Sequence, residues 1–255
     1  MPLKTWNGLA RANLKSYNGL LSANWKTWNG LSIPVTDPSW ASVQLLAVND
    51  NAADGTTTFI DQSAAAHTLT AVGNAQYDSA QAPTGMTTTC LGDGTGDRVD
   101  SGQSADFRLV TTSTLEYMIR FNAKGVGMRQ ITMTHSGGKI IGIICSSGGD
   151  SSKIELNHFG VAAIIVSATG LLANGVWYHV ALTTAAGTTT LWLDGTSVGT
   201  VADPFLAQDI TVQMMGNSTY TGSELNGWIS NVRLTKGVSR YSGSFTPPTL
   251  PMPTS

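Results

Sequence analysis

The acidic side chains and histidines are the groups of this sequence that could carry out acid–base or metal chemistry. Hydrolysis of a glycosidic bond needs two carboxyl groups about 5–10 Å apart, but the three glutamates, Glu116, Glu155 and Glu224, lie in separate segments. The histidines also stand far apart, without the paired spacing of metal ligands: His67, His135, His158 and His179. We therefore predict that the protein is not an enzyme, and a glycanase is the function that these residues favour least.

Two tryptophans are the candidates for binding a carbohydrate. Trp192 and Trp228 lie in strand-like segments, and exposed aromatic rings are the usual platform for a sugar. The alternative is that both rings pack in the core of a sandwich or between subunits. The sequence leaves both interpretations open.

The segment 176–201 contains the clearest strands of the chain. Tyr178, Val180 and Leu182 share one face of an extended segment, because side chains alternate along a strand. Asp194-Gly195 predicts a tight hairpin, since a type I′ turn needs positive φ at both central residues. Strands joined by such turns need a second layer to cover their apolar face.

Short strand-like runs recur through the chain and would supply that layer. They lie at 43–48, 58–61, 68–72, 86–91, 114–121, 131–133, 139–145, 153–157, 161–167, 210–215 and 228–234. Helical periodicity is almost absent, and the turns are rich in glycine. The sequence therefore predicts an all-β protein, an antiparallel sandwich.

The composition restricts the partners and the compartment. Charged residues make up 12% of the chain and the net charge is -2, which argues against nucleic acid as the main partner. No run approaches the roughly 18 apolar residues of a membrane span, and the first residues lack the apolar core of a signal peptide. We expect synthesis in a cytosol, no membrane partner, and buried free thiols at Cys90 and Cys145, although a disulfide stays open.

Residues 4–31 contain a repeat with a spacing of 11 residues. The sequence K-T-W-N-G-L at 4–9 recurs as K-S-Y-N-G-L at 15–20 and as K-T-W-N-G-L at 26–31. Asn-Gly in every unit would break a helix, so each unit is predicted to be a short strand and a turn. Basic and aromatic residues alternate here, so a single-stranded nucleic acid is one alternative partner, and a disordered tail is another.

The repeat is too small to bury its own apolar side chains, so we favour oligomerisation or docking. Three units form a thin structure at best, and three chains could cover one another's rings in a homotrimer. The residues predicted to make these contacts are Trp6, Leu9, Tyr17, Leu20, Trp25, Trp28 and Leu31. A linker with two prolines, 33–38, follows. The predicted domains are 1–36 (repeat), 37–248 (sandwich) and 249–255 (proline-rich extended tail).

Several motifs between residues 43 and 249 resemble the laminin-G-like module of the concanavalin A-like jelly-roll class, in the version found in phage structural proteins. They are DGTTTFID at 54–61, HTLTAVGNA at 67–75, LGDGTGD at 91–97, WYHVA at 177–181, LDG at 193–195, GWISNVRLTKGVSRY at 227–241 and FTPP at 245–248. The N-terminal repeat is similar to Asn-Gly-Leu repeats of phage tail and virion proteins. The acidic Glu-x-Asp-x-x-Glu cluster of the related glucanases is missing. The resemblance implies a concanavalin A-like sandwich.

The resemblance also implies a function. We expect a non-enzymatic structural protein of a phage virion: a fibre, tail or capsid decoration subunit with its sandwich displayed outward. Its partners would be copies of itself and other virion proteins. The alternative is a carbohydrate-binding module that recognises a host, whose partners would be glycans of the host surface. Relatives often hold Ca²⁺ in their loops, so calcium is the one cofactor considered, with Asp50, Asp54, Asp93 and Asp97 as candidate ligands. The same residues are ordinary in turns.

Overall fold

The computed structural model describes residues 37–109 and 112–254, together with the backbone of short strands before residue 33. The chain divides into two units. The first consists of Met1–Trp40 together with Pro253–Ser255, and the second is Ala41–Met252. In the first unit, three pairs of two-residue strands flank the Asn-Gly dipeptides of the repeat. The pairs are antiparallel: β1 (Thr5–Trp6) with β2 (Leu9–Ala10), β3 (Ser16–Tyr17) with β4 (Leu20–Leu21), and β5 (Thr27–Trp28) with β6 (Leu31–Ser32).

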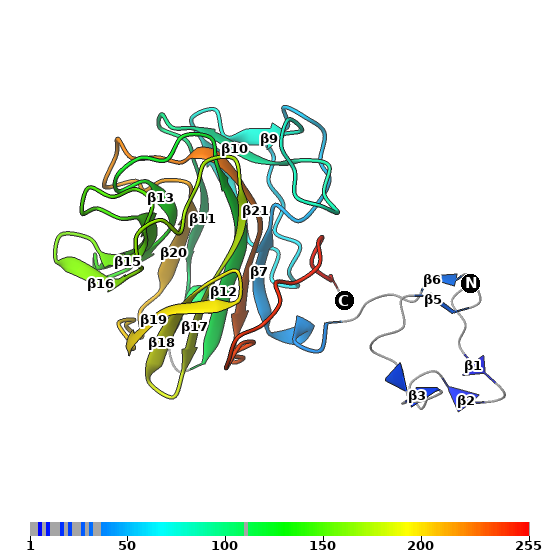
Figure 1. The fold of residues 1–255 in the computed structure, drawn as a ribbon. Helices are drawn as coiled ribbons and strands as arrows, with labels where there is room; N and C mark the ends of the chain where they lie inside the picture. Colours follow the sequence, from blue (N-terminus) through cyan, green and yellow to red (C-terminus); the bar gives the residue numbers. More distant parts are fainter. Residues whose placement is uncertain are drawn as a thin grey trace. The chain divides into compact units, whose positions relative to one another are not determined.

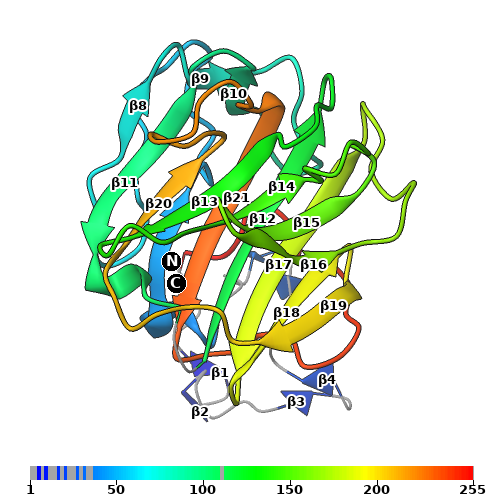
Figure 2. The same cartoon turned by 90° about the vertical axis from the view of Figure 1, so that its left-hand side faces the viewer.

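Two antiparallel sheets that lie face to face form the second unit (Figures 1 and 2). The eight-stranded sheet contains, in order, β19 (Thr196–Ala202), β18 (Thr188–Leu193), β17 (Trp177–Ala185), β12 (Ser113–Phe121), β21 (Asn226–Lys236), β10 (Thr89–Asp93) and β9 (Gln76–Asp78), with β7 (Val43–Ala47) also paired to β21. The seven-stranded sheet contains β16 (Ala162–Val166), β15 (Ile154–His158), β14 (Ile140–Cys145), β13 (Arg129–His135), β20 (Ile210–Met214), β11 (Arg98–Ser104) and β8 (Thr70–Val72). Short 3-10 turns form at η3 (Trp40–Ser42) and η4 (Ala105–Phe107). The predicted all-β sandwich is confirmed.

The core lies between the sheets, where alternate side chains of both meet. Leu115 and Ile119 of β12 face inward, as do Ile131 and Met133 of β13, and all four are fully buried. The face of β12 that carries these two residues is therefore the core face. Cys90 and Cys145 are free thiols in this core, where each acts as a small apolar side chain.

The turn at Asp194-Gly195 joins β18 to β19 as predicted. Both residues have positive φ, 47° and 78°, and Leu193 pairs with Thr196 across the turn. A Cβ atom on Gly195 would lie 1.7 Å from the carbonyl oxygen of Phe245. Glycine is therefore required here for the close approach of the C-terminal segment as well as for the turn.

The chain after β21 covers part of the outer face of the eight-stranded sheet. Phe245 donates its backbone N–H to Gly195 (3.1 Å), and further along Met252 donates to Asn49 (2.8 Å) and Asn231 (3.1 Å). Outward-pointing residues such as His179 are buried as a result. In the part of the chain that the structure describes, no helix is long and apolar enough to span a bilayer.

Candidate functional site

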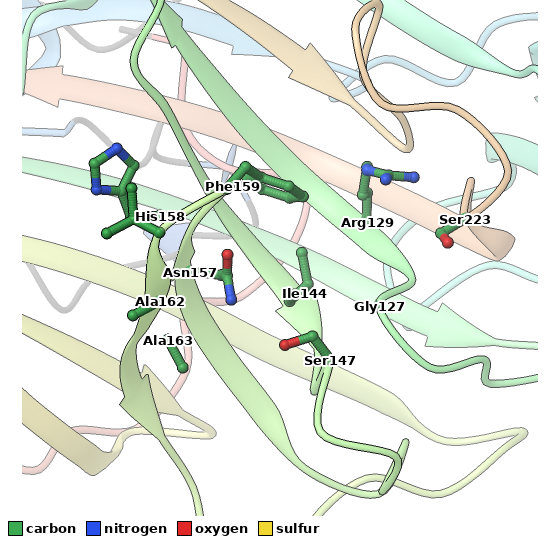
Figure 3. A pocket seen from close by; sticks show the side chains of 12 residues that line it. Gly127, Arg129, Ile144, Ser147, Asn157, His158, Phe159, Ala162, Ala163 and Ser223 are labelled. Atoms are coloured by element: carbon green, nitrogen blue, oxygen red, sulfur yellow. The ribbon is translucent and has the colours of Figure 1, made fainter.

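A hollow of about 410 Å³ opens on the outer face of the seven-stranded sheet (Figure 3). It forms there because Ile141 and Ile143 of β14 point into the core, so Ile144 points to the opposite face. Its lining comes from β13, β14, β15, β16 and the loops beside them: Gly127, Arg129, Ile144, Ser147, Asn157, His158, Phe159, Gly160, Val161, Ala162, Ala163 and Ser223. The hollow is lined by apolar and polar groups in equal measure, and convergent polar groups beside apolar side chains are typical of ligand sites.

The ring of Phe159 lines one side of the hollow, and the ring of Tyr220, which is outside the lining, stacks on it. The ring of Phe159 lies over Gly142 of β14, where a Cβ atom would come within 2.6 Å of its Cε2. Tyr220 stacks on Phe159 with 5.3 Å between ring centroids and 27° between planes. The absence of a side chain at Gly142 therefore lets the ring lie flat against the sheet, where its π-face is held in one orientation.

Arg129 lies between Phe159 and Ser223 (Figure 3). Its guanidinium carbon is 5.5 Å from the centroid of the Phe159 ring, and its backbone N–H donates to the carbonyl of Ser223 (2.8 Å). Only 6% of the residue is exposed. Burial lowers the pKa of the guanidinium, and the charge of Glu224 partly opposes this shift. Arginine still carries its charge in proteins, so the hollow contains a cation.

A buried carboxylate fixes the polar side of the hollow. Glu155 accepts hydrogen bonds from the hydroxyl of Ser147 (3.0 Å) and from the amide of Asn157. Ser147 and Asn157 therefore present their remaining hydrogen-bonding groups in fixed positions. Burial lowers the pKa of His158, with a smaller contribution from Lys139, so its imidazole is neutral near pH 7 and can exchange hydrogen bonds with a hydroxyl group.

The hollow lacks the groups needed for sugar hydrolysis. None of its lining residues, all of which belong to the described part of the chain, is an aspartate or glutamate. Residues 195–199 fit the Gly-x-Ser-x-Gly pattern of serine hydrolases, but the motif begins in a hairpin turn and continues into β19. A nucleophile elbow needs a turn from a strand to a helix.

Glu116 lies in a second cluster, under the C-terminal segment. Its fully buried carboxylate accepts hydrogen bonds from the guanidinium of Arg240 and the hydroxyl of Tyr241 (2.5 Å). It also lies 3.2 Å from Nε2 of His179 and 4.0 Å from Nε of Arg233. Burial alone raises the pKa of this carboxyl group, but the hydrogen bonds and positive charges hold it below its usual value. The arrangement is a buried ion cluster that fixes the C-terminal segment on the sheet.

The predicted sugar-binding tryptophans lie outside the hollow and are covered. Trp192 is 6% exposed, donates its N–H to Thr183 (2.8 Å) and meets the edge of the Phe245 ring. Trp228 is 9% exposed, donates to Asp78 (2.8 Å) and lies under the guanidinium of Arg120. Neither presents an open ring face to a sugar, because neighbouring segments cover the outer face of this sheet.

The four candidate calcium ligands make hydrogen bonds within loops. Asp97 accepts from the backbone N–H groups of Asn74 and Asp93, and Asp93 accepts from that of Thr95. Asp50 accepts from the hydroxyl of Tyr77, and Asp54 from the N–H of Ser79. Among the residues that could be searched, no three His, Cys, Asp or Glu side chains converge on one point. Calcium takes six to eight oxygens, backbone carbonyls included, so calcium binding in these loops stays a prediction.

The predicted oligomerisation side chains lie outside the described residues: Trp6, Leu9, Tyr17, Leu20, Trp25, Trp28 and Leu31. Sequence reasoning missed the residues that shape the hollow, namely Arg129, Phe159 and Tyr220. One signal was available, because Gly142 interrupts an otherwise apolar strand, and a glycine within a strand often marks the close approach of another group.

The topology and the hollow place the domain among the jelly-roll β-sandwiches. Residues 93–239, more than half of the chain, match the model of the concanavalin A-like lectin/glucanases superfamily. The chain belongs to this superfamily. The comparison with curated protein sequences gives no match.

Solved structures share the fold at low sequence identity. Domain 4 of AbnA, an extracellular GH43 arabinanase from Geobacillus stearothermophilus in complex with arabinotriose, is 11% identical with a TM-score of 0.56, and the alignment covers 77% of this chain and 94% of that one. The Trypanosoma rangeli sialidase in complex with 2,3-difluorosialic acid is 15% identical with a TM-score of 0.53, covering 75% of this chain and 30% of that one. The binding domain of botulinum neurotoxin DC in complex with SialylT is 18% identical with a TM-score of 0.51, covering 77% and 48%. This chain thus spans less than half of the latter two, and the likeness shows the fold alone.

Proposed function

We propose that this protein is a non-enzymatic, glycan-binding subunit of a phage particle. The sandwich binds a glycan in the hollow, and the N-terminal repeat attaches the subunit to the particle or to its own copies. The observation that carries the glycan-binding part is the wall of Phe159, Tyr220 and Arg129 beside the fixed polar groups of Ser147 and Asn157.

The chemistry of the hollow suits a sugar. A pyranose or furanose ring has an apolar face that packs on an aromatic ring and hydroxyl groups that exchange hydrogen bonds with Ser, Asn and neutral His side chains. Members of the same fold class solved with arabinotriose and with SialylT support this interpretation. The lack of a carboxylate pair in the lining supports a role in binding without hydrolysis.

The virion part of the proposal is supported by the sequence of the repeat. Three aromatic–Asn–Gly–Leu units of the same length recur before the sandwich, and so small a unit needs other chains to cover its apolar side chains. A fibre, tail or capsid decoration subunit that trimerises through residues 1–36 and displays the sandwich outward satisfies this requirement. Its partners are other virion proteins and glycans of the host surface.

A glycan array with the full-length chain tests the binding function. We expect binding at micromolar to millimolar concentration, and mass spectrometry should recover the bound glycan uncleaved. Phe159→Ala should weaken binding about tenfold, equivalent to about 1.4 kcal/mol, because it removes the ring from the wall. Ile60→Ala removes an exposed apolar side chain outside the lining and should leave binding unchanged.

Two results would contradict the proposal. Failure of every glycan on the array to bind at millimolar concentration, with and without Ca²⁺, would refute glycan binding and leave a structural role alone. Equal losses in the Phe159 and Ile60 variants would place the glycan site elsewhere.

A further inference from the structure

The guanidinium of Arg129 is nearly buried yet incompletely hydrogen-bonded. Its Nε and Nη1 atoms are both buried and have no hydrogen-bond partner among residues 37–109 and 112–254, and 6% of the residue as a whole is exposed. A buried donor without a partner costs about 1–3 kcal/mol, and more when it carries a charge. Such a group inside a hollow indicates that something else completes its hydrogen bonds.

The neighbours of Arg129 orient the guanidinium without satisfying it. The guanidinium carbon lies over the ring of Phe159, which accepts no conventional hydrogen bond. The carbonyl of Ser223 accepts from the backbone N–H of Arg129. Glu224 acts on the guanidinium through its charge, while both of its carboxylate oxygens accept from the backbone N–H of Gly222 (3.0 Å each). The guanidinium is therefore restrained, with the three N–H groups of Nε and Nη1 still to be paired.

We propose that the hollow selects an acidic glycan and that Arg129 binds its carboxylate or sulfate group. This inference rests on the proposed glycan-binding function and names the class of sugar. Arginine donates charge-assisted N–H bonds to such an anion. Its guanidinium carbon lies over the Phe159 ring, which restrains the side chain before the ligand arrives and reduces the entropic cost of binding.

The side chains that line the hollow agree with an anionic ligand, while the carboxylates of Glu155 and Glu224 lie behind the lining. Its lining, which lies within the described residues, includes no acidic side chain to repel an anion. With His158 neutral near pH 7, Arg129 supplies the positive charge of the lining. Ser147 and Asn157 lie on the other side of the hollow, where they can bind the hydroxyl groups of the same sugar (Figure 3).

Three probes test this inference: sialyllactose, sulfated lactose and lactose, titrated calorimetrically into the full-length chain. At least one acidic probe should bind about tenfold or more tightly than lactose, the range expected when a charge-assisted hydrogen bond is gained. Tighter binding of sialyllactose would identify the preferred anion as a carboxylate, and tighter binding of sulfated lactose would identify it as a sulfate. Arg129→Gln should abolish this preference and leave lactose binding within about twofold. Arg98→Gln is the matched control, because Arg98 lies in the same sheet, outside the lining, in an ion pair with Asp100.

Each outcome decides between the two levels of the proposal. Equal binding of all three probes, or a preference that survives Arg129→Gln, would overturn the acidic selectivity while leaving glycan binding intact. A complete lack of binding by all three would also overturn the acidic selectivity, whereas glycan binding itself is refuted when every glycan of the array fails to bind. If Arg129→Gln has a much lower melting temperature than the parent, Arg129→Lys replaces it in the experiment. Lysine keeps the positive charge but lacks the planar guanidinium. An unchanged preference for the acidic probes in Arg129→Lys would also refute the inference.

Discussion

The buried carboxylate of Glu116 provides the strongest prediction about stability. Glutamate, histidine, tyrosine and arginine side chains meet at this point, a set that resembles catalytic machinery in composition. All the partners of the carboxylate are donors or cations, and the cluster lies outside the lining of the hollow. We therefore expect Glu116→Ala to destabilise the protein and leave glycan binding intact.

The size of the effect follows from the contacts that are lost. The substitution removes the charge-assisted hydrogen bonds from Arg240 and Tyr241 and the anion 4.0 Å from Nε of Arg233. Breaking a buried ion pair by removing one partner costs about 3–5 kcal/mol. For a domain of roughly 200 residues each kcal/mol corresponds to about 2–4 °C, so the melting temperature should fall by roughly 6–20 °C.

Thermal melting and urea unfolding of the full-length chain measure this effect. Tyr241→Phe is a graded control, because it deletes one hydrogen bond and keeps the ring stacked on Phe245 at 3.5 Å; it should cost about 1.5–3 kcal/mol, the worth of a hydrogen bond to a charged group. The double variant Glu116→Gln/Arg240→Gln should lose less free energy of unfolding than the two single variants added together. Each single variant leaves the charge of its former partner unpaired, whereas the double variant removes both charges of the pair.

Two results would refute this reasoning. A fall of less than about 3 °C for Glu116→Ala would mean that the carboxylate does not hold the C-terminal segment in place. Loss of glycan binding by a variant that melts normally would place Glu116 in the binding site.

Three further predictions concern other parts of the chain. Burial lowers the pKa of His135 to about 4, whereas in the unfolded chain this imidazole binds a proton near pH 6.5. The contribution of His135 to stability should therefore be complete above pH 6.5 and fall by up to roughly 3 kcal/mol as the pH drops to 4. Urea unfolding of a His135→Leu variant should lack this dependence on pH. Gly142→Val should displace the ring of Phe159, because a Cβ atom at residue 142 would come within 2.6 Å of it. Calorimetry should show glycan binding weakened about tenfold, equivalent to about 1.4 kcal/mol. The control Gly243→Ala, which has open space around it, should leave binding unchanged. Deletion of residues 1–35 should convert a trimer into a folded monomer, and light scattering that still finds a trimer would contradict the role given to the repeat.

Most of the sandwich could be predicted from the sequence because its central strands are amphipathic or strongly apolar. The alternation at 114–121 and the turn residues Asp194-Gly195 each determine a local structure that the fold retains. The strands β9 and β11 were missed. The segment R-V-D-S-G-Q-S of β11 is polar and contains a register shift between Asp100 and Gln103, so no period of two residues marks it.

The candidate site was less predictable because its residues meet only in three dimensions. Arg129, Phe159 and Tyr220 come from three separate segments, and nothing in their spacing brings them together. The tryptophans were poor candidates for a related reason. Alternation with Leu191 and Leu193, which are in the core, places Trp192 on the outer face, but alternation cannot show that Phe245, far along the chain, covers that face.

The most direct test of glycan binding in the hollow is a crystal structure of the full-length chain soaked with sialyllactose. The account predicts density for the sugar in the hollow, with its ring against Phe159 and its carboxylate within hydrogen-bond distance of the guanidinium of Arg129. Density for the sugar on the eight-stranded sheet or in the loops around Asp93 and Asp97, with an empty hollow, would contradict it.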